Sequence, residues 1–302
     1  MQKDGRRLGT AALVAGALGI SASAVLNKLA IGTGLHPIWL NILRVGLALA
    51  VMLPFFLRKR EAVQALRSAP RRERWLTALA GVMLAVHFAT WTYALAYADS
   101  VVAVTIWSTC SLMTVVGSSL FLGERTPLPA LLGIMLALCG VGVLAIGASE
   151  SQLLGVLMAL GAAVTQAVYT LCGRVVRRKI DMLPNTTMVY AVSLGCLLLC
   201  ALALRVPTDG MAWESVGAGF LLALVCTLGG HSMQSYALKY HKAPTVSTAM
   251  LTEVITGPLL VFLVLGEVPK LVSVIGGVMI LIGVGWYMLY EWKHMFGSEA
   301  LT

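Results

Sequence analysis

The chain has 302 residues, of which 59% are hydrophobic and 12% are charged, and its formal net charge is +9. Soluble proteins contain about 25% charged residues, so this composition excludes a soluble enzyme, a nucleic-acid-binding protein and a disordered chain. The sequence therefore predicts an integral membrane protein, and its 30 glycines agree with close helix packing in lipid.

Ten apolar segments follow one another along the chain, and each has roughly the 20 residues that a helix needs to cross a bilayer. They cover residues 8–31, 37–57, 75–97, 101–122, 128–146, 153–175, 185–204, 216–238, 245–264 and 271–290. Several connections hold only a few residues, as is typical of antiparallel neighbours. We expect an all-α membrane protein of ten transmembrane helices, with every functional residue among them.

The basic residues of the loops indicate the orientation of these helices. Most of the 22 lysines and arginines fall on one side if the N-terminus is cytoplasmic, whereas Arg205 and Lys270 fall on the other. The densest group on the first side is Arg58, Lys59, Arg60, Arg67, Arg71, Arg72 and Arg74. Because cytoplasmic loops carry the excess of basic residues, we expect both termini in the cytoplasm and the chain in a plasma membrane, the inner membrane of a bacterium.

The sequence repeats itself at an offset of 143 residues. Residues 93–97 (YALAY) match residues 236–240 (YALKY), and the Leu-Gly-Glu at 122–124 recurs at 265–267. Each half holds five predicted helices, an odd number, so the second half must cross the membrane in the opposite sense. Inverted repeats of this kind form secondary transporters, with the substrate between the halves near the bilayer midplane. The two expected repeats are residues 1–148 and residues 149–302.

Three details add to this arrangement. A Gly-Glu pair ends the fourth and the ninth helix, at residues 123–124 and 266–267, a glycine-rich helix follows each pair, and Arg44 lies early in the second helix. The chain thereby resembles the EamA-type branch of the drug/metabolite transporter superfamily. The resemblance implies that helices one to four and six to nine surround a central cavity, with helices five and ten as supports. A Trp-Gly pair common in the family's first helix is replaced here by Ile20-Ser21.

Glu253 is the most conspicuous polar residue within a predicted span. It lies about 12 Å from the cytoplasmic end of the ninth helix by helix rise, and an acidic side chain near mid-bilayer costs at least about 2.5–3.5 kcal/mol. The repeat places Cys110 at the equivalent position, so the fold itself does not require a carboxylate. Three roles stay open for Glu253: an ion pair with a protein cation, contact with a substrate amine, or transfer of a coupling proton.

Arg44 and His87 are the predicted partners of Glu253 within the membrane. Arg44 either clamps carbonyls or a carboxylate of the protein, or binds a substrate carboxylate through two guanidinium nitrogens. His87 is either a packed side chain or a group that titrates near neutral pH and contributes to coupling.

Aromatic and amide side chains within the spans suit an organic ligand, or an amine held by cation–π contact. The alternative for tryptophan and tyrosine is anchoring at the membrane interface. The candidate substrate-binding residues of this kind are Trp91, Tyr93, Trp107, Gln166, Tyr169 and Gln234.

Four further residues are candidates for gating or coupling. Lys28 lies near the end of the first helix, Glu124 and Glu267 end the fourth and the ninth, and Pro258 follows Glu253 in the ninth. The alternatives are snorkelling of Lys28 to lipid headgroups, capping of helix ends by the two glutamates, and a static bend at the proline.

The sequence holds no P-loop, metalloprotease or nucleophile-elbow motif, so we expect no enzyme activity, cofactor, metal ion or nucleic-acid partner. We predict a secondary-active transporter of a small polar or zwitterionic metabolite, such as an amino acid, an amine or a drug-like molecule. It would work by alternating access and export or exchange its substrate. The alternatives are an uptake carrier for a vitamin or nucleotide-like metabolite and a membrane ligand sensor that does not transport. The expected partners are the substrate, a coupling proton and membrane lipids, with the chain a monomer or a homodimer.

Overall fold

The structure is a computed structural model that describes residues 2–123, 130–146, 150–209, 212–268 and 270–297. Every regular element in these ranges is helical, as the sequence predicted. Eight helical stretches are long and apolar enough to cross a membrane: Arg7–Gly32, Pro37–Arg58, Arg71–Tyr97, Ser100–Leu122, Gln152–Arg177, Met182–Ala203, Trp213–Ala237 and Ala243–Leu265. Two further apolar stretches, Met135–Leu144 and Leu271–Tyr287, are shorter. The all-helical membrane fold is thereby confirmed, and the count of ten spans stays a prediction.

The helices follow the predicted segments, with one addition and several interruptions. The first half forms α1 (Gln2–Ser21), α2 (Ser23–Gly32), α3 (Pro37–Arg58), α4 (Arg60–Ser68), α5 (Arg71–Tyr97), α6 (Ser100–Trp107), α7 (Cys110–Leu122) and α8 (Ala130–Ile146). The second half forms α9 (Glu150–Arg177), α10 (Met182–Ala203), α11 (Trp213–Leu221), the π-helical stretch η1 (Leu222–Ser232), α12 (Met233–Ala237), α13 (Ala243–Ala249), α14 (Thr252–Leu265) and α15 (Leu271–Gly297). The short α4 lies in what the sequence predicted to be a loop, and it packs against α3 and α10.

The fourth and the ninth predicted helices are each broken near the middle, which the sequence analysis did not predict. The breaks lie between α6 and α7 and between α13 and α14, at positions that the 143-residue repeat makes equivalent to within one residue. The Ser108 hydroxyl donates to the Thr105 carbonyl at 2.6 Å. The Thr252 hydroxyl likewise donates to the Ala249 carbonyl at 2.9 Å. Such side-chain bonds satisfy backbone carbonyls that a broken helix leaves without partners in lipid.

Helices α8 and α15 pack against each other through glycines. A Cβ atom added to Gly140 would lie 2.8 Å from the Gly276 carbonyl oxygen, and one added to Gly133 would collide with the Gly283 carbonyl oxygen. The repeat makes Gly133 equivalent to Gly276, and Gly140 to Gly283. Because the earlier glycine of each helix meets the later glycine of the other, the two equivalent helices run antiparallel.

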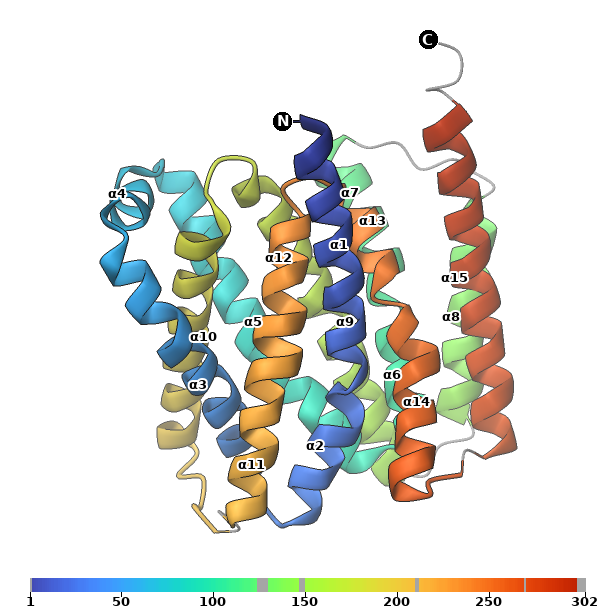
Figure 1. Cartoon of the computed structure of the whole chain (residues 1–302). Helices are drawn as coiled ribbons and strands as arrows, with labels where there is room; N and C mark the ends of the chain where they lie inside the picture. Colours follow the sequence, from blue (N-terminus) through green and yellow to red (C-terminus); the bar gives the residue numbers. More distant parts are fainter. Residues whose placement is uncertain (1, 124–129, 147–149, 210–211, 269, 298–302) are drawn as a thin grey trace.

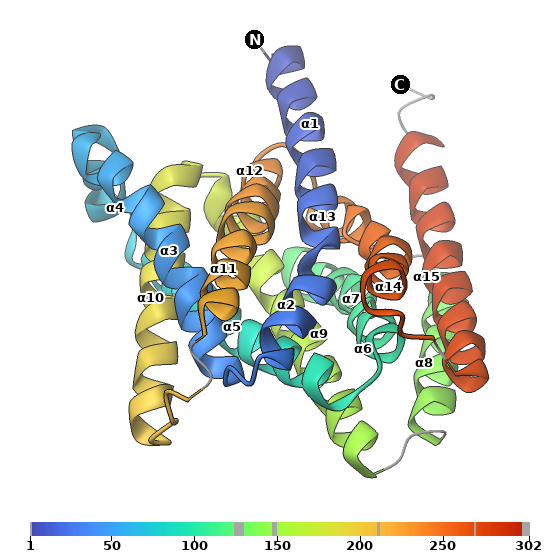
Figure 2. The same ribbon diagram turned by 60° about the horizontal axis from the view of Figure 1, so that its bottom comes forward.

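The first and the last helix reach the same end of the bundle. The start of α1 and the end of α15 lie at the same end of the bundle, and α4 lies at that end too (Figure 1). The α8–α15 pair forms one edge of the bundle, and α3, α4 and α10 form the opposite edge in both views (Figure 2). Buried residues of α1, α5, α6, α9 and α14 form the main apolar core between these edges.

Candidate functional site

A small enclosed cavity lies where segments of both halves meet. Its lining residues are Ile20, Ser23, Arg44, His87, Trp91, Trp107, His231 and Glu253. The open volume is about 10 Å³, which accommodates about one water molecule. The cavity in this conformation is therefore much smaller than a metabolite, and Ile20, Trp91 and Trp107 are among the side chains that line it.

Glu253 lies in the first turn of α14, directly after the break, where the positive end of a helix dipole favours a negative charge. The side chain is 2% exposed, and its Oε1 atom has no hydrogen-bond partner. Among the described residues, Glu253 forms no ion pair. The predicted pairing with Arg44 or His87 is thus not formed here, although all three line the same cavity.

The Arg44 guanidinium is buried and has hydrogen-bond partners for only part of its nitrogens. Its Nε atom donates to the Thr227 hydroxyl at 2.7 Å, and its guanidinium carbon lies 3.8 Å from the centre of the Phe88 ring, a cation–π contact. Tyr190 donates to the Thr227 carbonyl at 3.0 Å and so helps to fix that residue. The Arg44 Nη1 atom is buried without a partner, which leaves a charged donor for a ligand.

His231 lines the cavity beside His87, and the sequence analysis missed it. The two imidazole rings lie 5.9 Å apart, and the His231 Nδ1 atom has no partner. His87 Nδ1 lies 3.0 Å from the Ala162 carbonyl oxygen, and because a carbonyl only accepts, this nitrogen carries a proton. The signal that could have found His231 was its position inside a predicted span, since ionisable residues there mark functional sites.

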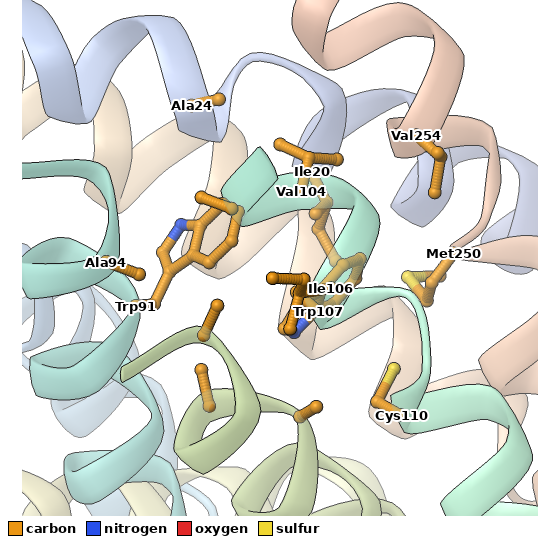
Figure 3. Packing of buried hydrophobic residues seen from close by; sticks show 14 of the residues in the cluster. Ile20, Ala24, Trp91, Ala94, Val104, Ile106, Trp107, Cys110, Met250 and Val254 are labelled. Atoms are coloured by element: carbon orange, nitrogen blue, oxygen red, sulfur yellow. The ribbon is translucent and has the colours of Figure 1, made fainter. Parts of the chain in front are cut away.

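Trp91 and Trp107 form the aromatic wall of the cavity. Their rings lie 5.7 Å apart at an angle of 50°, and Figure 3 shows them close together, with Ile20 nearby. Trp91 Nε1 donates to the Ser23 hydroxyl at 3.1 Å, whereas Trp107 Nε1 is buried without a partner. The indole of Trp107 therefore offers a second donor without a partner among the residues that line the cavity.

The other predicted aromatic and amide residues do not line the cavity. Tyr93 stacks on Tyr97 at 6.2 Å. Tyr169 is buried, and its ring lies 6.2 Å from that of His231, which does line the cavity. Gln166 donates to Gln234 at 3.4 Å. These residues were predicted because they lie within the spans, and none of them is among the residues that line the cavity.

Lys28 and Glu267 form an ion pair at 2.5 Å, away from the cavity. The Ser100 backbone N–H donates to the same carboxylate at 2.7 Å, and its hydroxyl does so at 3.1 Å. Partial burial opposes ionisation of Glu267, but the bonds from Lys28 and Ser100 outweigh it and lower the pKa of the carboxyl group. The pair joins α2 of the first half to the segment after α14 in the second. Lys28 is thus engaged by a carboxylate rather than directed to lipid headgroups.

The two remaining gate candidates are Glu124 and Pro258. Glu124 lies outside the described residues. Pro258 lies within α14, which is continuous from Thr252 to Leu265, so the ninth span is interrupted before Glu253 rather than at the proline. In the part of the chain that the structure describes, no group of three or more His, Cys, Asp or Glu side chains could hold a metal ion.

The fold and the site define a multi-pass helical membrane protein with a buried polar site contributed by both halves. The model of the EamA-like transporter family matches residues 7–146 and again residues 153–289. The chain therefore belongs to the EamA-like transporter family, the membrane transporters of the drug/metabolite type.

Solved structures agree on the fold. A protein of known crystal structure is 21% identical to this chain and superposes with a TM-score of 0.67, covering 95% of this chain and 98% of its own. No curated protein matches the sequence.

Proposed function

We propose that this protein is a secondary-active transporter of a small zwitterionic metabolite, such as an amino acid, and that Arg44 and Glu253 bind its opposite charges. The observation that carries the proposal is that these two buried charged residues line one cavity without pairing, each with an unsatisfied polar atom. Unpaired buried charges are costly. A ligand with a carboxylate and an ammonium group would satisfy both.

The neighbouring groups support the same ligand. Trp107 Nε1 supplies a neutral donor for the substrate carboxylate beside Arg44, and the indole faces can receive an ammonium group by cation–π contact. His231 Nδ1 supplies one further polar atom without a partner. A nucleotide-like substrate suits the site less well, because its phosphates would lie beside the Glu253 carboxylate. The walls of Ile20, Trp91 and Trp107 favour an apolar body.

Transport follows from relative movement of two inverted five-helix halves, which we propose for residues 1–148 and residues 149–302. The antiparallel packing of the repeat-equivalent helices α8 and α15 supports this topology, as does the family model that matches each half. Since the cavity holds about one water molecule, the described conformation is closed around the site, and movement of the halves must open it.

We propose that the ion pair of Lys28 with Glu267, together with the hydrogen bonds from Ser100, forms an outer gate. It joins the two halves at the end opposite the start of α1, which the excess of basic residues places outside the membrane if the N-terminus is cytoplasmic. We propose the inner membrane of a bacterium as the location and export or exchange as the direction, on the resemblance to the family. When no substrate is bound, a proton on Glu253 would neutralise its buried charge and remove the free-energy cost of an unpaired carboxylate. We therefore propose that the protein exchanges a proton for its substrate.

Counterflow in proteoliposomes tests this proposal. Vesicles loaded with an unlabelled amino acid from a panel should take up the labelled form, and Glu253→Gln should abolish uptake while the matched exposed variant Glu61→Gln should not. A stabilising ligand in a thermal-shift screen identifies the panel member to use, because binding stabilises the folded state. Binding without exchange would indicate the sensor, and exchange of vitamins or nucleotides but not of zwitterions would contradict the proposed substrate class.

A further inference from the structure

The segment from the end of α3 to the start of α5 carries a concentrated positive charge. Its exposed basic residues, which we call the basic patch, are Arg58, Lys59, Arg60, Arg67, Arg71, Arg72 and Arg74. The segment contains two acidic residues. Glu73 is 2% exposed and is bound by Lys179, and Glu61 is exposed on α4. Among the described residues, none of the arginines of the patch forms an ion pair.

One groove in this patch combines charge with an apolar floor. It is lined by Arg71, Arg74, Trp75 and Ala78, whose spacing of three, four and seven residues puts them on one face of α5. Trp75 is 65% exposed. The same side of the helix continues into the membrane span with Leu79 and Val86, each 41% exposed.

We propose that this groove binds an anionic phospholipid of the surrounding bilayer, with the headgroup phosphate between Arg71 and Arg74 and an acyl chain along Trp75 and Ala78. Guanidinium groups bind phosphate oxygens through two parallel hydrogen bonds. Indole rings favour the depth of the headgroups. A soluble anion would satisfy the arginines but leave the apolar surface uncovered, so the combination of arginines with Trp75 and Ala78 favours a lipid.

Helix α4 adds to the attraction. Its residue Ala62 is buried against the bundle, while Arg60, Gln64 and Arg67 are exposed, so the helix lies on the bundle with its polar face outward at the end of the spans (Figure 1). A second groove, lined by Leu57, Arg60, Val63, Gln64 and Arg67, extends the positive surface beside the first. Groups of four to eight basic residues directly beside the cytoplasmic end of a membrane span attract anionic lipid, and the basic patch has seven. The site does not depend on which solute is transported.

Lipid titration of the purified protein tests the site. In nanodiscs of phosphatidylcholine, addition of phosphatidylglycerol at constant total lipid should raise the melting temperature of the wild-type protein. The double variant Arg71→Gln/Arg74→Gln should need on the order of tenfold more phosphatidylglycerol for the same rise, since each basic residue near an anionic surface contributes to binding. The matched control Arg58→Gln/Arg72→Gln removes the same charge from exposed positions that line neither groove.

An equal loss in the two double variants would overturn the groove and indicate diffuse attraction to the patch. An unchanged response of Arg71→Gln/Arg74→Gln would overturn the proposal as well. If that variant does not fold, brominated phosphatidylglycerol gives a second measurement: it should quench wild-type tryptophan fluorescence more than brominated phosphatidylcholine does. Trp75→Phe should remove that difference, and its persistence in Trp75→Phe would contradict the site.

Discussion

The two breaks in the fourth and the ninth span have similar backbones and different chemistry. Each break is followed by a buried side chain at the repeat-equivalent position, Cys110 in the first half and Glu253 in the second. The break belongs to the fold, because both halves keep it and both satisfy it with hydroxyl groups. The carboxylate belongs to one half and lines the cavity, which is consistent with the binding role that we propose for it.

We expect the largest loss of transport when the Glu253 carboxylate is replaced. Glu253→Gln should lower the counterflow rate at least about thirtyfold, since truncating a buried charge contact costs about 2–5 kcal/mol, while the melting temperature stays close to that of the wild type. Cys110→Ser, at the equivalent position, should leave the rate unchanged. Equal losses in both variants would show that the break, and not the carboxylate, matters for transport.

Replacement of Arg44 tests the positive charge that lines the same cavity. Arg44→Lys keeps the charge but loses the planar fork that reaches Thr227 and the cavity together, so substrate affinity should fall about ten- to a hundredfold, as expected for a charged hydrogen bond worth about 1.5–3 kcal/mol. Affinity is measured by thermal shift or tryptophan fluorescence. Arg58→Lys, on the exposed patch, is the control, and wild-type affinity in Arg44→Lys would exclude a direct contact with the substrate carboxylate.

Unlike the two breaks, the contact between α8 and α15 has the same chemistry in both halves, because glycines form it on both helices. A methyl group at residue 283 would collide with the Gly133 carbonyl, whereas one at residue 285 meets nothing within 4 Å. Gly283→Ala should lower the free energy of unfolding by about 1–3 kcal/mol, and Gly285→Ala should have little effect. Denaturation in detergent measures both, and equal stability of the two variants would argue against close packing here.

The proposed outer gate should respond only weakly to pH, and this response is the smallest of the predicted changes. Because the pKa of Glu267 is lowered in the folded protein, the ion pair stabilises the closed state above the usual carboxyl pKa of about 4.3 and is lost as pH falls through the lowered value. Labelling of Ser23→Cys by an impermeant thiol reagent, divided at each pH by the labelling rate of a free thiol to correct for the thiolate fraction, should therefore be slow and constant between pH 8 and pH 5.

Lys28→Met should raise that labelling rate a few-fold at every pH in this range, since it removes the partner of Glu267. The matched variant Glu214→Gln removes an exposed acid of α11 and should not. A wild-type rate that climbs steeply near pH 6 would mean that another group controls closure.

The structure brings some of the predicted site residues together at the cavity and leaves others away from it, for one reason. Glu253, Arg44, His87, Trp91 and Trp107 were predicted and line the cavity together. Tyr93 and Gln166 were predicted because they also lie within spans, and they do not line the cavity. Depth along a helix follows from its rise, but the direction of a side chain depends on how the helix is rotated against its neighbours.

The pattern of apolar and polar residues was enough to predict that the chain spans a membrane, where most of its helices lie and that its halves repeat, because lipid excludes polar groups and admits apolar helices of one length. The tertiary structure decided which polar residues meet. It brought His231 to the cavity from the π-helical stretch, set the breaks before Cys110 and Glu253, and kept Arg44 and Glu253 apart. Those features arise from packing between segments far apart in the chain, which hydropathy and spacing along one segment do not encode.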